Sequence, residues 1–160
     1  MMSYEPRGRG FSLVELVLVM ALIGIVSALI APGLMNGFTS ARLKTSVQKT
    51  VAIINYTRNQ AVFKKRPMWL LCDRKTNQVA VVDLIGEGKV YSYPEDVLIE
   101  KLVIGGTEVF DSQGAFIFYP SGSSSGGEIG LRAKDGRSYR ITIDLFLSTV
   151  KVLANGKETG

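Results

Sequence analysis

An uninterrupted apolar run constrains this chain more than any other feature of its sequence. The 20 residues from Leu16 to Met35 carry no charge, and Ser27 has the only polar side chain among them. At ~1.5 Å per residue, a helix of this length extends roughly 30 Å, the thickness of the hydrocarbon core of a bilayer. The run therefore predicts a single helix that spans a membrane, because no other stretch of the 160 residues approaches this length.

A carboxylate lies directly before the run. Glu15 is flanked by Phe11, Leu13 and Val14 on one side and by the apolar residues on the other. An acidic side chain in the middle of a bilayer costs about 2.5–3.5 kcal/mol on insertion scales, and less near the interface. We therefore expect a cationic partner for Glu15.

The residues on both sides of Glu15 follow a distinctive order. Arg7, Arg9 and Gly10 precede Phe-Ser-Leu-Val-Glu-Leu, which begins at Phe11 and leads into the apolar run. This order resembles the class III signal of type IV pilins and type II secretion pseudopilins. The resemblance implies that a prepilin peptidase cleaves the Gly10–Phe11 bond, that Phe11 is then N-methylated, and that Glu15 guides the docking of subunits. An α-amino group is largely protonated near neutral pH, so that of one subunit can neutralise Glu15 of its neighbour.

Two simpler interpretations of this amino terminus are a plain transmembrane anchor and a secretory signal peptide. The apolar run is too long for a signal peptide, carries Glu15 at its start, and is followed by no clear Ala-x-Ala site. A plain anchor does not require Gly-Phe-x-x-x-Glu in this register. The pilin-like signal therefore fits these residues best.

The composition argues against catalysis and against a bound cofactor or metal. The chain has no histidine and one cysteine, so it lacks the usual general base, an intrachain disulfide and a Cys/His metal cluster. Cys72 follows Met-Trp-Leu-Leu, and a lone cysteine in such a run is most often a buried small hydrophobe. Acidic residues after position 66 are scattered among turns and strand ends. A membrane-anchored periplasmic enzyme or sensor is thus the weakest of the functional alternatives.

The helix is predicted to continue well beyond the apolar run. Gly24 and Pro32 predict a kink inside it, a feature that pilins share, although an ordinary kink in a membrane helix explains each residue equally well. Apolar residues then recur every three or four positions to about Ala61, with basic residues on other faces. Pro67 disfavours a helical Arg66, so the helix should end near Lys64.

The sequence of the carboxy-terminal part predicts antiparallel strands separated by turn residues. Candidate strands cover residues 68–73, 78–84, 89–93, 97–104, 115–119, 128–134, 139–145 and 149–153. Asp135-Gly136 is a strong signal for a two-residue hairpin turn. The amphipathic helix can cover the apolar face of the strands, which predicts an α+β fold.

Four segments follow from this pattern. They are a leader over residues 1–10, a transmembrane and assembly helix over residues 11–35, an amphipathic stem helix over residues 36–66 and a β-rich head over residues 67–160. The pilin resemblance implies the same long helix packed on an antiparallel β-rich head. It also implies an inner-membrane location, with the amino terminus in the cytoplasm and the head in the periplasm.

A Ser/Gly-rich stretch, Tyr-Pro-Ser-Gly-Ser-Ser-Ser-Gly-Gly, spans residues 119–127. It lacks the Gly-Lys-Ser/Thr ending of a phosphate-binding loop and leads into a strand, so we interpret it as a flexible connector between strands. Together with the aromatic residues before it and the Ile-Gly-Leu strand after it, this stretch is similar to the GspH/FimT branch of minor pseudopilins and minor pilins.

The net charge of +5 is concentrated in the stem. Residues 36–66 carry seven basic side chains and no acid, whereas residues 67–160 carry ten basic and twelve acidic ones. A solvated helix face near lipid headgroups or acidic neighbours is the main interpretation, and DNA binding is the alternative. A second, smaller basic group lies near the carboxy terminus and is interpreted as ordinary strand surface: Arg132, Lys134, Arg137, Arg140, Lys151 and Lys157.

The leading functional prediction is a minor pseudopilin of a type II secretion pseudopilus. The alternative is a minor pilin of a type IV pilus or competence system, with DNA as a further partner. In either case the resemblance implies four kinds of partner: other pilins or pseudopilins, the prepilin peptidase, an inner-membrane assembly platform and membrane lipid.

Overall fold

The computed structural model of the protein describes residues 12–86, 88–154 and 157–158, and the side chains of residues 28–39 and 157–158 lie outside this description. The chain divides into two compact units, Met1–Gly37 and Phe38–Gly160. One helix, α1 (Leu13–Lys64), belongs to both. We call the part of α1 that lies in the second unit the stem, and the strands that follow it the head.

The ends of α1 have local causes. The carbonyl of Ser12 accepts hydrogen bonds from the backbone N–H groups of Glu15 and Leu16, at 3.0 and 3.2 Å, and so opens the first turn. At the other end Lys65 adopts a left-handed φ of 51°, and the N–H of Arg66 bonds back to the carbonyl of Ala61. The predicted end at Lys64 is confirmed. The predicted start at Phe11 lies outside the described residues.

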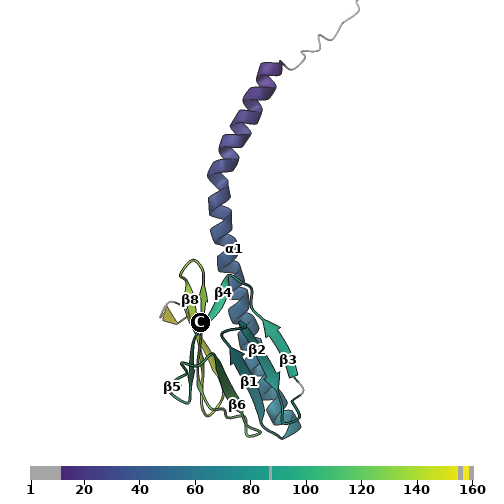
Figure 1. Ribbon diagram of the computed structural model, residues 1–160, viewed down its shortest axis with the longest axis vertical. Coiled ribbons are helices and arrows are strands. Elements are labelled where there is room, and N and C mark those ends of the chain that lie inside the picture. The colour runs from purple at the N-terminus through teal and green to yellow at the C-terminus, as the bar shows by residue number, and fades with distance from the viewer. Residues whose placement is uncertain (1–11, 87, 155–156, 159–160) are drawn as a thin grey trace, which may run out of the picture. The chain divides into compact units, whose positions relative to one another are not determined.

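Two antiparallel sheets form the head (Figure 1). The first has the order β3-β2-β1-β6, and the second has the order β10-β9-β8-β7-β4-β5. Their bounds are β1 (Met68–Asp73), β2 (Gln78–Val82), β3 (Gly88–Ser92), β4 (Val97–Ile104), β5 (Thr107–Glu108), β6 (Gln113–Phe118), β7 (Gly127–Ala133), β8 (Ser138–Ile143), β9 (Val150–Ala154) and β10 (Lys157–Glu158).

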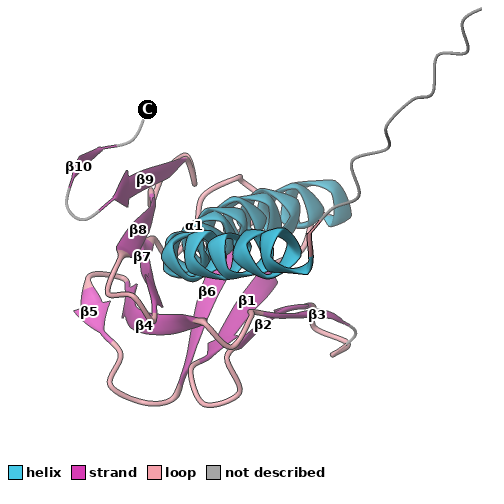
Figure 2. Ribbon diagram, turned by 90° about the horizontal axis from the view of Figure 1, so that it is seen from above, coloured by secondary structure: helices cyan, strands magenta, loops and turns pink. Residues whose placement is uncertain are grey.

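The stem and the inner faces of both sheets share one hydrophobic core. The stem passes over β1, β2 and β6, and β7 and β8 stand beside it (Figure 2). Its buried residues Leu43, Ile54 and Ala61 belong to the same cluster as buried side chains of both sheets. Among the core residues from the strands, the largest with less than 2% exposure are Leu70, Leu102, Phe116, Phe118, Ile129, Leu131 and Ile141. The α+β class with antiparallel sheets is therefore confirmed.

Each of the eight predicted strands is present, with differences of one or two residues at most of the ends. β5 and β10 are absent from the prediction, because two-residue strands carry no periodic signal. A hairpin joins β7 to β8 at the predicted place, but its turn is not the predicted two-residue turn at Asp135-Gly136. The N–H of Gly136 bonds to the carbonyl of Ala133 at 3.0 Å, so Lys134 and Asp135 are the central residues, and Gly136 follows them with a positive φ of 88°. Cys72 is buried as predicted, and burial raises the pKa of its thiol from 9.0 to about 12.

The Ser/Gly-rich stretch is the clearest departure from the prediction, which interpreted it as flexible. Hydrogen bonds fix it along most of its length. The Ser124 hydroxyl accepts from the N–H of Gly126 and donates to the carbonyl of Asp144, at 3.0 and 2.9 Å. The N–H of Ser125 donates to the carbonyl of Ile117 at 2.8 Å, and the Ser125 hydroxyl accepts from the N–H of Ile117. The serines thus replace the hydrogen bonds that a regular ladder would make.

Candidate functional site: the amino-terminal helix

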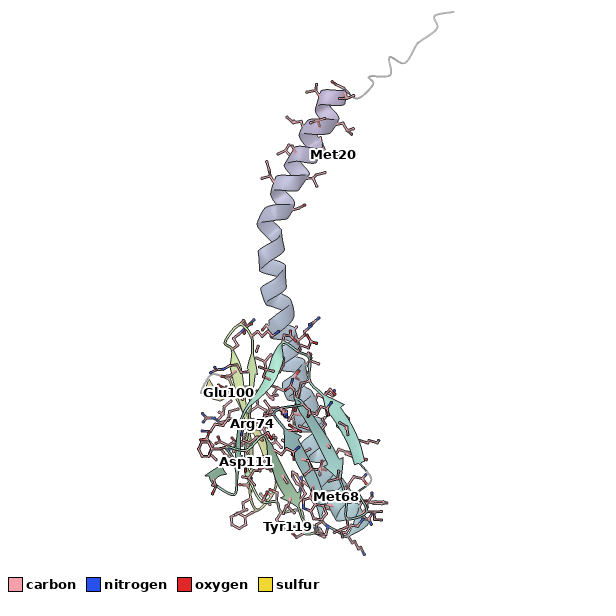
Figure 3. All side chains as sticks on the ribbon, viewed as in Figure 1. Met20, Met68, Arg74, Glu100, Asp111 and Tyr119 are labelled. Atoms are coloured by element: carbon pink, nitrogen blue, oxygen red, sulfur yellow. The ribbon has the colours of Figure 1, made fainter. Side chains whose placement is uncertain are left out.

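The first half of α1 presents apolar side chains on every side. Leu13 is 79% exposed and Met20 is 69% exposed, and the other large apolar side chains up to Val26 are exposed as well. Figure 3 shows them projecting in all directions around the helix near Met20. A helix that is apolar all round needs an apolar environment, which lipid or other helices can supply. Within the part of the chain that the structure describes, no helix has both the length and the hydropathy needed to cross a membrane.

Glu15 occupies the first turn of α1, three residues after Ser12. This is the Ser-x-x-Glu spacing of a capping box, in which the serine is the N-cap residue and the glutamate lies at the third helical position. A carboxylate there is stabilised by the positive end of the helix dipole. Ser12 was not among the predicted site residues, although its spacing from Glu15 could have identified it.

The structure describes the other predicted site residues only in part. Gly10 and Phe11, which flank the predicted cleavage bond, lie outside the described residues. At Gly24 an added Cβ would meet nothing within 4 Å among the described residues, apart from its chain neighbours and the backbone of its own helix, so no described contact requires a glycine there. Pro32 lies within α1, and its side chain is among those not described. The kink at Gly24 and Pro32 stays a prediction.

The stem is attached to the head by ion pairs as well as by the core. The Asp83 carboxylate, with its side chain only 4% exposed, contacts Arg66 at 2.6 Å and Lys64 at 3.5 Å. The Ile85 N–H, which bonds to Asp83 Oδ1, lowers the pKa of this carboxyl first, and Arg66 lowers it further. Near the other end of the stem, Arg42 contacts Asp96 at 3.5 Å. Three of the seven basic residues between positions 36 and 66 therefore pair with acids of the head.

The outer face of the six-stranded sheet carries mixed charges around Gly130. Arg132 contacts Glu100 at 2.8 Å, and Arg140 contacts Glu128 at 3.5 Å. Together with Lys101, these residues line a shallow groove of about 620 Å³. Arginines that are already paired with carboxylates present little net positive potential. The arrangement agrees with the interpretation of the carboxy-terminal basic group as ordinary strand surface.

Two sequence profiles match the chain. The profile described as Type II transport protein GspH matches residues 46–145, which is more than half of the 160 residues. The profile described as prokaryotic N-terminal methylation motif matches residues 6–31, which include Gly10, Phe11 and Glu15.

Two individual proteins are also similar to this chain. The Type II secretion system protein H of Xanthomonas campestris pv. campestris is 29% identical over 143 residues, which cover 89% of this chain and 82% of that protein. The type IV major pilin protein PilA of Myxococcus xanthus is 38% identical over 63 residues, which cover 39% of this chain and only 28% of PilA.

Among solved structures, the fold is similar to that of the minor pseudopilin EpsH from the Type 2 Secretion System of Vibrio cholerae. The TM-score is 0.57 at 13% sequence identity, and the match covers 72% of this chain and 99% of EpsH. At this identity the likeness concerns the fold alone. The profile match over stem and head confirms the branch that the Ser/Gly-rich stretch and the leader suggested. The chain belongs to the GspH family of type II transport proteins.

Proposed function

We propose that this chain is a minor pseudopilin of a type II secretion system, made as a membrane-inserted prepilin and assembled through α1. The observation that carries the proposal is the presence on one chain of the GspH profile and the methylation motif. The exposed apolar side chains between Leu13 and Val26 supply the surface that assembly through a helix requires. In this proposal the helix anchors the protein in the inner membrane and the head is periplasmic.

Processing and assembly are linked by the charge on the new amino terminus. Cleavage of the Gly10–Phe11 bond by a prepilin peptidase releases an α-amino group on Phe11, which is then N-methylated. That amino group is a cation close to neutral pH and lies four residues from Glu15. Within a bundle of apolar helices, an isolated carboxylate is costly, and a neighbour's amino terminus offsets that cost. Glu15 is therefore assigned to the docking of subunits.

A pilus subunit is the second candidate, because part of the chain matches the Myxococcus pilin. The structure gives little support for the DNA contact that was considered with it. Arg132 and Arg140 already contact Glu100 and Glu128, and a phosphate would have to displace those carboxylates.

Secretion by a deletion strain tests the leading proposal. The strain and a complemented control are compared for the amount of one exoprotein in the periplasm and in the medium. Accumulation in the periplasm is expected, with release restored by the complementing gene. Normal secretion would remove the pseudopilus function and leave the pilus candidate.

Intact-mass measurement of the mature protein tests the processing step. The expected mass lacks residues 1–10 and includes one added methyl group. A protein that still begins at Met1 or Met2 would contradict cleavage at Gly10–Phe11.

The role of Glu15 is tested with Glu15→Ala and with the isosteric Glu15→Gln. Both variants should remain in the membrane fraction, and both should lose co-purification with the other pseudopilins, because each removes the negative charge. Normal assembly of the glutamine variant would show that the shape of the side chain, and not its charge, directs docking.

A further inference from the structure

The turn between β8 and β9 exposes three large apolar side chains in succession. Leu145, Phe146 and Leu147 project from this turn, and Phe146 is 77% exposed. The backbone beneath them is fixed, because Asp144 Oδ1 accepts hydrogen bonds from the N–H groups of Phe146 and Leu147 at 2.9 and 2.8 Å. These hydrogen bonds fix the directions in which the three side chains leave the backbone.

Hydrogen bonds join this turn to the end of the stem. The buried Ser148 hydroxyl donates to the carbonyl of Gly122 at 2.8 Å. Gly122 in turn lies against the stem, because a Cβ added to it would stand 3.9 Å from Arg58 Nε and 4.0 Å from Val62 Cγ2. The β8–β9 turn, the Ser/Gly-rich stretch and the last turns of α1 therefore form one continuous surface.

That surface carries six exposed apolar or aromatic side chains, which we call the terminal patch: Val62, Phe63, Tyr119, Leu145, Phe146 and Leu147. Phe63 is 84% exposed. In Figure 3, Tyr119 lies at the same end of the head as Met68, which follows α1 in the chain. Aromatic side chains that project from a fixed backbone are typical of the residues that contribute most to protein interfaces.

The charges beside the terminal patch are mainly positive. Lys64, Lys65 and Arg66 follow Phe63 directly, and Arg58 lies beside Gly122. Asp83 contacts two of these cations, Lys64 and Arg66, which leaves their group with a net positive charge. Asp144, the acid of the β8–β9 turn, uses one carboxylate oxygen for the backbone of that turn. The electrostatic complement of this surface is negative.

We propose that the terminal patch is a docking surface for a segment of another protein that carries carboxylates next to large apolar side chains. The apolar side chains supply burial and the cations select an acidic partner. Aromatic side chains that project from a fixed backbone suit a protein surface better than a lipid surface, which has no shape to complement. The terminal patch shares no residue with the apolar surface between Leu13 and Val26, so this proposal does not depend on assembly through α1.

Photocrosslinking with the full-length chain tests this docking surface. Phe63 and Phe146 are replaced one at a time by p-benzoylphenylalanine, in cells that produce the other pilin-like proteins of the same secretion system. The matched control is Phe110, which is 86% exposed and precedes β6, whereas Tyr119 follows that strand. Crosslinks from both patch positions should be about tenfold stronger than those from Phe110, and mass spectrometry should map them to a segment with Asp or Glu beside Leu, Ile or Phe.

Charge reversal supplies the second measurement. Lys65→Glu should lower the patch crosslinks about tenfold, while Lys75→Glu, an equal change in the β1–β2 turn, should leave them unchanged. Crosslinks to lipid, to a second copy of this chain or to a segment without carboxylates would overturn the proposal, as would equal yields at Phe110. The mass of the same samples reports cleavage at Gly10–Phe11, so a failure of processing is distinguished from a failure of docking.

Discussion

The contact between Thr50 and Tyr93 gives a sharp test of how the stem is held on the head. Thr50 is fully buried, and its Oγ1 lies 2.6 Å from the Tyr93 hydroxyl oxygen. The same Oγ1 donates to the carbonyl of Ser46 at 2.8 Å. A threonine hydroxyl has one proton, so the Tyr93 hydroxyl is the donor in the contact between the two side chains. The two partners are therefore not equivalent.

Because Tyr93 donates and Thr50 accepts, removing either side chain's hydroxyl should lower the free energy of unfolding by a different amount. Tyr93→Phe removes a donor but leaves Thr50 bonded to Ser46, so it should lower the free energy of unfolding by about 0.5–1.5 kcal/mol. Thr50→Val leaves the Tyr93 hydroxyl without its acceptor in a buried place, which should cost about 1–3 kcal/mol. With both changes together no polar group is left without a partner. The double variant should therefore be more stable than Thr50→Val alone, with a coupling energy of about 1 kcal/mol.

Urea unfolding of the full-length chain in a non-ionic detergent measures these differences. Trp69, the only tryptophan, lies in β1 and reports on the head by its fluorescence. A loss of about 2 kcal/mol should lower the midpoint by about 1 M, because urea m-values of small domains are about 1–3 kcal/mol per M. Thr45→Val, which removes an exposed hydroxyl from the same helix, is the control. Additive losses, or a double variant less stable than Thr50→Val, would refute the contact between the two hydroxyls, and equal costs for the two single variants would refute its assigned direction.

Two further predictions use the same assay. Burial raises the pKa of Cys72 from 9.0 to about 12, so the thiol ionises more readily in the unfolded chain. The free energy of unfolding should be unaffected by this group below pH 9.0 and should fall by up to about 1.4 kcal/mol per pH unit above it. Cys72→Ala should lose this part of the pH dependence, and equal pH profiles for the two proteins would contradict the assignment. Gly106→Ala should cost about 1–2 kcal/mol, because φ is 84° with no atom within 4 Å of the new Cβ. Gly127→Ala should cost about 2 kcal/mol more, because its Cβ would lie 2.0 Å from the Val103 carbonyl oxygen, and equal losses would exclude this steric conflict.

Local signals were sufficient for most of the secondary structure. Pro67 ends the helix near Lys64, because the residue before a proline avoids the helical conformation. Alternation of apolar and polar residues predicted a half-buried strand over residues 139–145. The observed strand is β8 (Ser138–Ile143), and its burial alternates toward the carboxy end. The leader depends on residue types at fixed spacings, which are visible without a structure.

The order in which the strands pair could not be predicted from local sequence signals. β1 pairs with β6 and β4 pairs with β7, and each pairing joins segments separated by other strands. Such pairings depend on packing against a shared core, and no short window of sequence contains that information. The Ser/Gly-rich stretch was misinterpreted for a related reason. Its composition allows a flexible linker, but the acceptors and donors that fix Ser124 and Ser125 come from β6 and from the end of β8.

The positive charge of the stem is another property that long-range contacts change, and this change bears on function. In the sequence, seven basic residues without an acid suggest a helix that faces anionic lipid or acidic neighbours along its whole length. In the structure, Arg42 meets Asp96, 54 residues away, and Lys64 and Arg66 meet Asp83, 19 and 17 residues away. The head thus offsets part of the charge at both ends of the stem. Because Asp83 serves two cations and Lys65 lies between them in sequence, a positive excess persists at the end of α1, beside Phe63. The basic character of the stem is therefore most relevant to partners at the terminal patch.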